Sequence, residues 1–550
     1  MARTDPVRRL RSDFTLGAEQ AESDRLLEEA FYESDHYKAI HRRDDTRCFL
    51  IGRTGSGKSA ALQHLEASNP DHVIRINPQD LSLAYITELG VIQYLASLNV
   101  HLDPLFIALW KHVLLVEVIR HRYRINSFEE KRTFLTSLSA KLSRDPSKKA
   151  ALDYLDEFEG RFWCETDERV KDITERFERQ VESEAKARFG VSHIGSIGAG
   201  ATSSTSTSTE VRAEQANRFQ RIVNETQLPR LNKMIKVLDE DILDSDQLFT
   251  YIVIDDLDQD WVDEHVANTL IRCLFRTILE MQRIRRLKIL VALRTNIFEE
   301  LNFGGRSGGQ EEKVRSLTLR MRWAPAQLRS LLDERARVAA DHYSLPKVES
   351  IKDLVPPTNK TRGDPLRFIL DRTLMRPRDA MAYINQCLTL ASGKTRLTWD
   401  EIQSAETPYS HDRLLALRDE WKATYPGVDQ IFDIFRFAPI PMNKEEFASR
   451  LEDAAMLRAE PDFPGILWIT ELAQPIWEGI GSWAEKHHRL THLLFNLGFI
   501  GCSSGRKAPT YFYDDPDFAD RLNNLEEAEF FHIHPAFRAA LDTIPGSLTP

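Results

Sequence analysis

The chain has 550 residues, 42% of them hydrophobic and 29% charged, and its formal net charge at pH 7 is −11. This composition is typical of a folded protein with a sizeable core and excludes a globally disordered chain. The length predicts about two to four domains. The acidic balance argues against a protein that coats nucleic acid, although it is compatible with a local basic groove.

The lack of a recognisable targeting signal in the sequence and the pattern of its cysteines together predict a cytoplasmic protein without membrane contact. The segment "MARTDPVRRLRSDF" is basic but has no apolar stretch, so no secretory signal is expected. The longest apolar segment, "PLFIALWKHVLLVEVI", is interrupted by Lys111, His112 and Glu117, and it predicts a buried helix rather than a membrane span. The cysteines lie far apart and form no CxxC pair, which indicates reduced thiols: Cys48, Cys164, Cys273, Cys387 and Cys502.

In the first part of the chain, helical patterns surround two short strands. Residues 18–42 have helical spacing and strong helix formers, so they predict a helix. "TRCFLI" at 46–51 predicts a buried strand, which runs into "GRTGSGKSA" and a following helix. "HVIRIN" at 72–77 predicts a second strand, and residues 82–190 are almost entirely helical in pattern.

The middle of the chain contains an uncharged segment, "GSIGAGATSSTSTST" at 195–209. It predicts a flexible surface loop, and ordering on a ligand or a neighbouring subunit is the alternative. Beyond a helical pattern at 211–238, strands alternate with helices, which predicts a parallel α/β sheet. The expected elements are strands at 248–254, 288–293 and 316–323, a helix at 262–284, a glycine-rich loop at 301–313, helices from 324 to about 405, and helices with short strands such as "GFIGC" and "TYFYD" over 410–550.

The segment "GRTGSGKS" at 52–59 matches the phosphate-loop pattern G-x-x-x-x-G-K-[ST] in full, with a strand before it and a helix after it. Glycines let the backbone N–H groups curl around phosphates, and the helix N-terminus adds a favourable dipole. Lys58 is expected to reach the β- and γ-phosphates and Ser59 to ligate Mg²⁺. The predicted nucleotide-binding residues are Gly52, Arg53, Thr54, Gly55, Ser56, Gly57, Lys58, Ser59 and Ala60.

The segment "YIVIDDLDQDW" at 251–261 places acidic residues at the end of a predicted buried strand. A calcium loop starting at Asp256 is excluded, because Trp261 stands where glycine is required and Ala267 where glutamate is required. A strand ending in two acids is instead the Walker B pattern that accompanies a phosphate loop. Asp255 is then expected to hold Mg²⁺ through water and Asp256 to orient or deprotonate the attacking water.

The other polar residues near these motifs have weaker signals. Asp258 and Asp260 are expected to cap the next helix or to hold the loop. The predicted strand at 288–293 ends at "RTN", where Arg294 or Asn296 could sense the γ-phosphate, or Arg294 could contact a neighbour.

Taken together, "LIGRTGSGKSA" and "YIVIDDLDQDW" resemble the AAA+/STAND branch of P-loop NTPases, near the KAP type and a family of bacterial ATPases. The "RPRD" at 376–379 and the "HPAF" at 534–537 also resemble this family, in which the latter is a C-terminal strand. The resemblance implies the AAA+ sheet order, a helical lid and a lock formed by a winged helix. It also implies that Arg376 or Arg378 is a sensor-2-like arginine near the γ-phosphate.

The resulting expectation is an α/β P-loop fold with a large helical insertion, a helical lid and a winged-helix-like C-terminal domain. The predicted domains are an N-terminal helical segment at 1–45, an ATPase core at 46–81 and 248–323, an insertion at 82–247, a lid at 324–405, and the C-terminal domain at 410–550. No arginine finger for activation in trans is evident in the sequence.

We expect a Mg²⁺-dependent ATPase switch that controls its own conformation or assembly and a partner protein or a second copy. The catalytic residues would be Lys58, Asp256, Arg294 and Arg378, with Arg376 binding nucleotide. The resemblance implies a bacterial setting such as antiviral defence or stress. The alternatives are an ATPase that acts on DNA or RNA, which is not favoured, and a nucleotide-binding scaffold without turnover.

Overall fold

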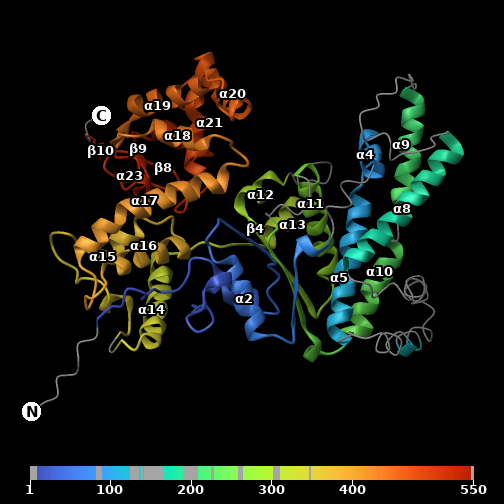
Figure 1. Cartoon of the computed structure of the whole chain (residues 1–550). Coiled ribbons are helices and arrows are strands. Elements are labelled where there is room, and N and C mark those ends of the chain that lie inside the picture. Colours follow the sequence, from blue (N-terminus) through green and yellow to red (C-terminus); the bar gives the residue numbers. More distant parts are fainter. Residues whose placement is uncertain are drawn as a thin grey trace, which may run out of the picture. The chain divides into compact units, whose positions relative to one another are not determined.

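The computed structural model describes residues 9–81, 90–123, 136–137, 140, 166–189, 209–224, 228–257, 264–301, 310–345 and 348–546. The chain divides into two compact units (Figure 1). We call Asp35–Arg53 with Ala61–Arg320 the sheet unit, and Met1–Ser34 with Thr54–Ala60 and Met321–Pro550 the helical unit. In the described residues, no helix is both long and apolar enough to cross a bilayer.

The sheet unit is built on five parallel strands in the order β2-β3-β4-β1-β5. The strands are β1 (Phe49–Gly52), β2 (Val73–Ile76), β3 (Thr250–Ile254), β4 (Leu287–Arg294) and β5 (Thr318–Arg320). Aliphatic runs predict strands that are covered on both faces, and every residue of β1 and β3 is buried. The predicted α/β class is confirmed, and the order is the one that the AAA+ resemblance implies.

Helices and strands of the sheet unit share one hydrophobic core. α11 (Glu264–Met281) follows β3, and Phe275 on this helix stacks on Phe49 of β1 with ring centroids 3.9 Å apart. The shorter helices are α1 (Asp35–His41), α12 (Thr295–Glu300) and α13 (Gln310–Ser316), and most of α2 (Lys58–Ser68) also lies in this unit.

The described part of the insertion is helical, as predicted. It contains α4 (Gly90–Ser97), α5 (Asp103–Tyr123), α8 (Thr166–Phe189), α9 (Thr209–Asn224) and α10 (Leu228–Val237). The apolar α5 is buried, and its Lys111 pairs with Glu280 of α11 and donates to Asn232 of α10 at 2.7 Å. The loop predicted at 195–209 lies outside the described residues, apart from the residue at which α9 begins.

In the helical unit, four helices follow β5 in the chain: α14 (Pro325–His342), α15 (Pro365–Leu370), α16 (Pro377–Leu390) and α17 (Trp399–Trp421). The first three begin with proline, whose fixed φ suits the first turn of a helix. Figure 1 shows α17 running from this group into the C-terminal helices. α17 therefore belongs both to the group with α14 to α16 and to the C-terminal part of the unit.

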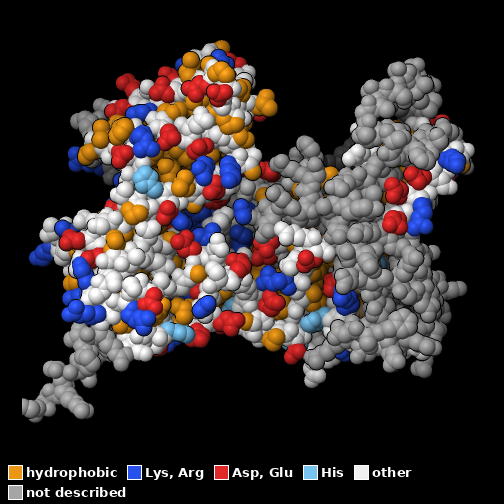
Figure 2. Space-filling model, viewed as in Figure 1, with side chains coloured by type: hydrophobic (Ala, Val, Ile, Leu, Met, Phe, Trp, Pro, Cys, Tyr) orange, Lys and Arg blue, Asp and Glu red, His pale blue; other side chains and the backbone are white. Residues whose placement is uncertain are grey.

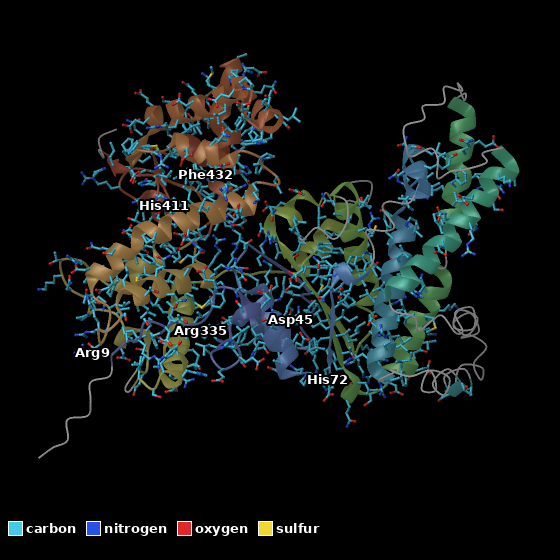
Figure 3. The ribbon with its side chains drawn as sticks, viewed as in Figure 1. Arg9, Asp45, His72, Arg335, His411 and Phe432 are labelled. Carbon is cyan, nitrogen blue, oxygen red and sulfur yellow. The ribbon has the colours of Figure 1, made fainter. Side chains whose placement is uncertain are left out.

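The helix predicted over 18–42 is wrong for most of its length. Only a 3-10 turn (Ala21–Ser23) and α1 are helical there. Residues 9–34 form a strap that packs on α14 and α16 with Leu10, Phe14 and Leu16 buried. Asp24 forms a buried ion pair with Arg335 of α14 and accepts two strap N–H groups, so tertiary contacts outweigh helix propensity. Arg335 is labelled in Figure 3.

The C-terminal part combines helices with an antiparallel sheet of order β7-β9-β8, as a winged helix does. The helices are α18 (Val428–Ile434), α19 (Lys444–Met456), α20 (Ile466–Glu478) and α21 (Trp483–Asn496). The strands are β7 (Met442–Asn443), β8 (Ile500–Ser503) and β9 (Phe530–Ile533), and β6 (Pro439–Ile440) pairs separately with β10 (Ile544–Pro545). Phe432, labelled in Figure 3, lies in the core of this part.

Two strands expected in this part are not strands. "TYFYD" contributes a single bridge from Thr510 to Cys502 and then turns. "HPAF" at 534–537 forms a helical turn, α23 (Pro535–Arg538), because Pro535 occupies the first helical position and His534 Nδ1 accepts the Ala536 N–H at 3.1 Å. The short helix α22 (Leu522–Glu527) precedes β9.

Candidate nucleotide-binding site

The predicted phosphate loop lies at the carboxyl end of β1. Gly52 ends the strand and Arg53 follows it, and residues 54–60 belong to the helical unit. Lys58 and Ser59 are the first two residues of α2, so they stand at a helix N-terminus, as an anion site requires. Gly55 and Gly57 have φ angles of +78° and +92°, which favour glycine and give the loop its curl.

Three successive loop carbonyls accept hydrogen bonds from the helical unit. The Thr54 carbonyl accepts from Arg376 Nη1 at 2.8 Å, the Gly55 carbonyl from the Arg378 backbone N–H at 3.4 Å, and the Ser56 carbonyl from Trp323 Nε1 at 2.8 Å. In a trans peptide the C=O and the next N–H point in opposite directions. The N–H groups of residues 55, 56 and 57 therefore point away from these donors, as a phosphate-binding nest requires.

Arg376 is the centre of a buried charge network at the first of these carbonyls. Its Nε donates to Asp379 at 3.0 Å and its Nη1 to Glu420 at 3.1 Å, and its side chain is 10% exposed. Glu420 also accepts the Thr54 N–H at 3.3 Å, so Thr54 is held through both its amide and its carbonyl. Arg413 of α17 closes the network on Asp379 at 3.1 Å.

Neighbouring opposite charges keep Arg376 and Asp379 ionised although both side chains are buried. Burial alone would lower the pKa of Arg376, but the carboxylates of Asp379 and Glu420 outweigh it and raise this pKa. Burial would raise the pKa of Asp379, but the guanidinium groups of Arg376 and Arg413 outweigh it and lower this pKa to about 2. The network is therefore a set of paired charges at neutral pH.

Arg378 lies closer to the glycines of the loop. A Cβ on Gly55 would lie 2.7 Å from Arg378 Cβ, so α16 packs directly against the loop backbone. Arg378 Nε donates to the Glu19 carbonyl of the strap at 3.1 Å. Burial lowers the pKa of its guanidinium, so this side chain is less well paired than that of Arg376.

The sheet unit places the predicted acids at the carboxyl edge of its strands, where ligands bind in open α/β sheets. Asp255 follows β3 directly and is 6% exposed. Asp256 has a φ of +59°, and its N–H donates to Asp255 Oδ1 at 3.0 Å. Aspartate tolerates this left-handed conformation better than most residues, and here it turns the chain sharply at the strand end.

Arg294 shares this edge, because β4 lies between β1 and β3. It is the last residue of β4, is paired in register with Gly52 of β1, and precedes α12 immediately. Asn296 lies inside α12. Asp258 and Asp260 lie outside the described residues, so their predicted capping roles stay predictions.

Two residues at the loop were not predicted from the sequence, namely Trp323 and Glu420. Trp323 follows β5, and only its place after an alternating apolar segment could have drawn attention to it. Glu420 lies 366 residues after Thr54 in the chain, near the end of a long helix with many other charged residues. No local pattern distinguishes it from a solvated glutamate.

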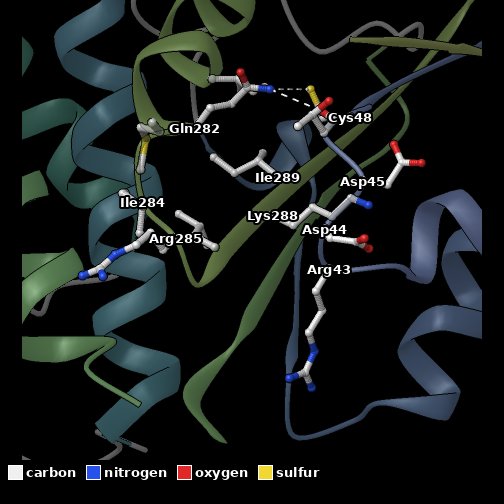
Figure 4. A pocket seen from close by; sticks show the side chains of 13 residues that line it. Arg43, Asp44, Asp45, Cys48, Gln282, Ile284, Arg285, Lys288 and Ile289 are labelled. Atoms are coloured by element: carbon white, nitrogen blue, oxygen red, sulfur yellow. Dashed lines mark hydrogen bonds between the residues drawn. The ribbon is translucent and has the colours of Figure 1, made fainter. Parts of the chain in front are cut away.

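The sheet unit also has a cavity of about 200 Å³ at its other edge, where β1 and β4 begin (Figure 4). Lys288 lines it and donates to the carbonyls of Ala39 at 2.8 Å and Arg42 at 2.7 Å, at the end of α1. Burial lowers the pKa of Lys288 to about 8 and raises that of Cys48 to about 12. These groups are held by protein partners, which indicates a structural role.

In the winged-helix-like part, the position of a recognition helix is taken by α21. His488 hydrogen-bonds the Ala519 carbonyl at 3.0 Å and His492 contacts Asp520 at 2.7 Å, so residues from the β8–β9 connection lie against this helix. Figure 2 shows acidic and basic side chains interspersed over the C-terminal helices, with hydrophobic ones around α19 and α20.

The described residues contain no group of three or more His, Cys, Asp or Glu side chains placed to hold a metal ion. Four cysteines are free and buried in the described part of the chain: Cys48, Cys273, Cys387 and Cys502.

Comparison with known proteins matches one segment of the chain to a family. Residues 326–418, which span α14 to most of α17, match the FunZ-associated C-terminal helical domain. The comparison with curated protein sequences gave no match. A solved structure of the Aeropyrum pernix ORC1 protein in complex with DNA matches over 96% of this chain and 94% of that chain, with 14% identity and a TM-score of 0.29. A TM-score of this size does not establish a common fold.

Proposed function

We propose that the protein is an ATP-binding and ATP-hydrolysing P-loop switch. The observation that carries the proposal is the loop itself, in which three consecutive carbonyls accept hydrogen bonds from other parts of the helical unit and two glycines adopt positive φ angles. The hydroxyls of Thr54 and Ser56 are buried, and neither has a hydrogen-bond partner among the described residues. Buried polar groups of this kind are normally satisfied, so they also support a ligand at this loop.

The roles of the individual residues follow from the chemistry of phosphoryl transfer. Lys58 would contact the β- and γ-phosphates, and Ser59 and Asp255 would hold Mg²⁺. A bound Mg²⁺ would neutralise the charge that develops on the phosphates. Asp256 would orient the attacking water. Gly52, Arg53 and Ala60 would flank the phosphates as the two ends of the loop.

We assign the sensing of the γ-phosphate to Arg294 and Arg378. Arg294 is placed by β4 at the carboxyl edge of the sheet, and Arg378 by α16 against Gly55. Arg376, expected to bind nucleotide, has Nε and Nη1 engaged by Asp379, Glu420 and the Thr54 carbonyl. Its effect on nucleotide is therefore proposed to pass through the loop.

The same proposal includes a regulatory output. α17 contributes to two hydrophobic cores of the helical unit, one with α14 to α16 and one with the C-terminal part. A change at the loop thus has a route to the C-terminal part, which a partner protein or a second copy would read. The proposal also keeps the predicted domains, whose limits lie at residues 45, 81, 247, 323 and about 405–410. It further includes a role in bacterial defence or stress.

The test is nucleotide binding and phosphate release by the purified full-length protein, its Lys58→Ala variant and its Asp256→Asn variant. The wild type is expected to bind and hydrolyse ATP with Mg²⁺, with loss of binding in Lys58→Ala and loss of turnover with retained binding in Asp256→Asn. Removing a residue that acts only in the transition state lowers kcat and leaves binding intact. A wild type that binds no nucleoside triphosphate refutes the proposal.

The two other functions are outcomes of the same experiment. Hydrolysis stimulated by DNA or RNA, with a steep salt dependence, would identify an ATPase that acts on nucleic acid. Tight ATP binding without turnover in the wild type would identify a scaffold. Light scattering with and without ATP reports the change in mass that the assembly switch requires.

A further inference from the structure

The loop residue Thr54 is held by a buried carboxylate, although this loop is expected to bind an anion. Glu420 Oε1 accepts the Thr54 N–H at 3.3 Å, and Glu420 Oε2 accepts from Arg376 Nη1 at 3.1 Å. The Glu420 side chain is 5% exposed. A buried carboxylate is costly unless it is paired and hydrogen-bonded, so this arrangement calls for a physical account.

The hydrogen bonds among Thr54, Glu420 and Arg376 form a closed ring. Arg376 bonds both to Glu420 and to the Thr54 carbonyl, and Glu420 bonds to the Thr54 amide. One ion pair therefore fixes both polar groups of Thr54, and with them the orientation of the peptide that carries the Gly55 N–H. Removing Glu420 would free the amide and leave Arg376 with Asp379 as its remaining carboxylate partner.

Glu420 lies in the half of α17 that belongs to the C-terminal core. Leu417 and Trp421, which flank it, are buried in that core. Trp399 and Tyr409, in the first half of the helix, are buried in the other core, with α14 to α16. The carboxylate that holds the loop is thus carried by a segment fixed to the C-terminal part.

We propose that Glu420 is a positioning residue of the phosphate loop, which orders Thr54 for nucleotide binding and couples the occupancy of the loop to the C-terminal part. The proposal rests on the proposed nucleotide function and adds to it a residue and a direction of coupling. Because the loop amides contact phosphate in the ground state and the transition state alike, the loss of Glu420 acts mainly on affinity.

The matched control is Glu406, which also lies on α17. Glu406 pairs with Arg372 at 2.7 Å, and both side chains are 22% exposed. Both partners lie outside the phosphate loop, so Glu406→Ala removes a comparable ion pair from the same helix. Thermal unfolding of both variants reports whether either change disturbs the fold.

The experiment measures ADP and ATP binding and steady-state hydrolysis for the wild type, Glu420→Ala, Glu420→Gln and Glu406→Ala. Glu420→Ala is expected to raise the Kd and KM about tenfold and to change kcat less than about threefold, because it removes a hydrogen bond to a charged group. Glu420→Gln keeps an acceptor for the Thr54 amide, so its Kd should lie between those of the wild type and Glu420→Ala. Glu406→Ala is expected to bind like the wild type.

Amide hydrogen exchange at saturating nucleotide measures the coupling between the phosphate loop and the C-terminal part. In the wild type, nucleotide should slow exchange in the second half of α17 and in α18, and this change should be absent in Glu420→Ala. If the wild type binds nucleotide and both Glu420→Ala and Glu406→Ala bind it with the wild-type affinity, the inference is overturned and the proposed function stands. The absence of nucleotide binding by the wild type refutes both. If Glu420→Ala does not fold, Glu420→Gln decides the matter: a Kd above that of the wild type supports the inference, and a wild-type Kd overturns it.

Discussion

Gly55→Ala provides a direct test of how tightly α16 packs on the phosphate loop. Two costs apply at this position. The φ of +78° is unfavourable for alanine by about 1–2 kcal/mol, and the new Cβ would lie 2.7 Å from Arg378 Cβ. Carbon atoms prefer a separation of about 3.5–4.0 Å, so loop or helix must move by about 1 Å, which typically costs a further 1–3 kcal/mol.

Gly363→Ala separates these two costs. Gly363 has the same φ of +78°, and nothing lies within 4 Å of a Cβ built there. It should therefore lose only the backbone cost of about 1–2 kcal/mol and keep the wild-type affinity for nucleotide. Gly55→Ala should lose more stability in denaturant unfolding and should bind ATP at least tenfold more weakly in calorimetry.

Equal behaviour of the two alanine variants would refute the reasoning. If Gly55→Ala unfolds at the denaturant concentration of Gly363→Ala and binds nucleotide like the wild type, then α16 does not constrain the loop. Weaker binding with no extra loss of stability would show that the new methyl group blocks the phosphates directly, without displacing α16.

Two further predictions concern stability. Burial lowers the pKa of Lys288 in the folded protein to about 8, below the ordinary 10.5 of lysine, so the unfolded chain binds more protons between these values and the contribution of Lys288 to stability rises with pH by at most about 3 kcal/mol. Buried thiols such as Cys48, whose pKa is raised, act in the opposite direction. The difference in unfolding free energy between the wild type and Lys288→Met should therefore shift in favour of the wild type from pH 7.5 to pH 10, and an unchanged difference would contradict the lowered pKa. Asp24→Asn should destabilise the protein by about 3–5 kcal/mol in denaturant, because it leaves Arg335 buried without its carboxylate. Asp13→Asn is its control and should have no measurable effect, because the Arg11–Asp13 pair is exposed; equal losses would contradict the buried pair.

The nucleotide motifs were predictable because their chemistry depends on residues that are close in the chain. The glycines, Lys58 and Ser59 must be adjacent to form the loop, and Asp255 must follow a buried strand. The alternation of apolar strands and amphipathic helices likewise predicted the parallel sheet, and the pairing of the strands confirmed it. The roles assigned to these side chains stay predictions.

What the sequence did not predict depends on contacts between distant segments. Helix propensity over 18–42 was overridden by the pairing of Asp24 with Arg335 and by burial of strap side chains. The turn at His534 depends on a side-chain acceptor followed by Pro535, which strand periodicity does not register. The contact of Glu420 with Thr54 joins residues 366 positions apart, and no local spacing encodes it.

The strap also has a consequence for synthesis on the ribosome. Its anchors are late in the chain, since Asp24 pairs with a residue 311 positions later and the Leu16 N–H donates to Asn385, 369 positions later. At about 5–20 residues per second, these partners emerge roughly 15 to 75 seconds after the strap. During that interval Leu10, Phe14 and Leu16, which are buried in the finished fold, have no place to pack. This segment of the nascent chain should therefore be a binding site for chaperones until α16 has been made.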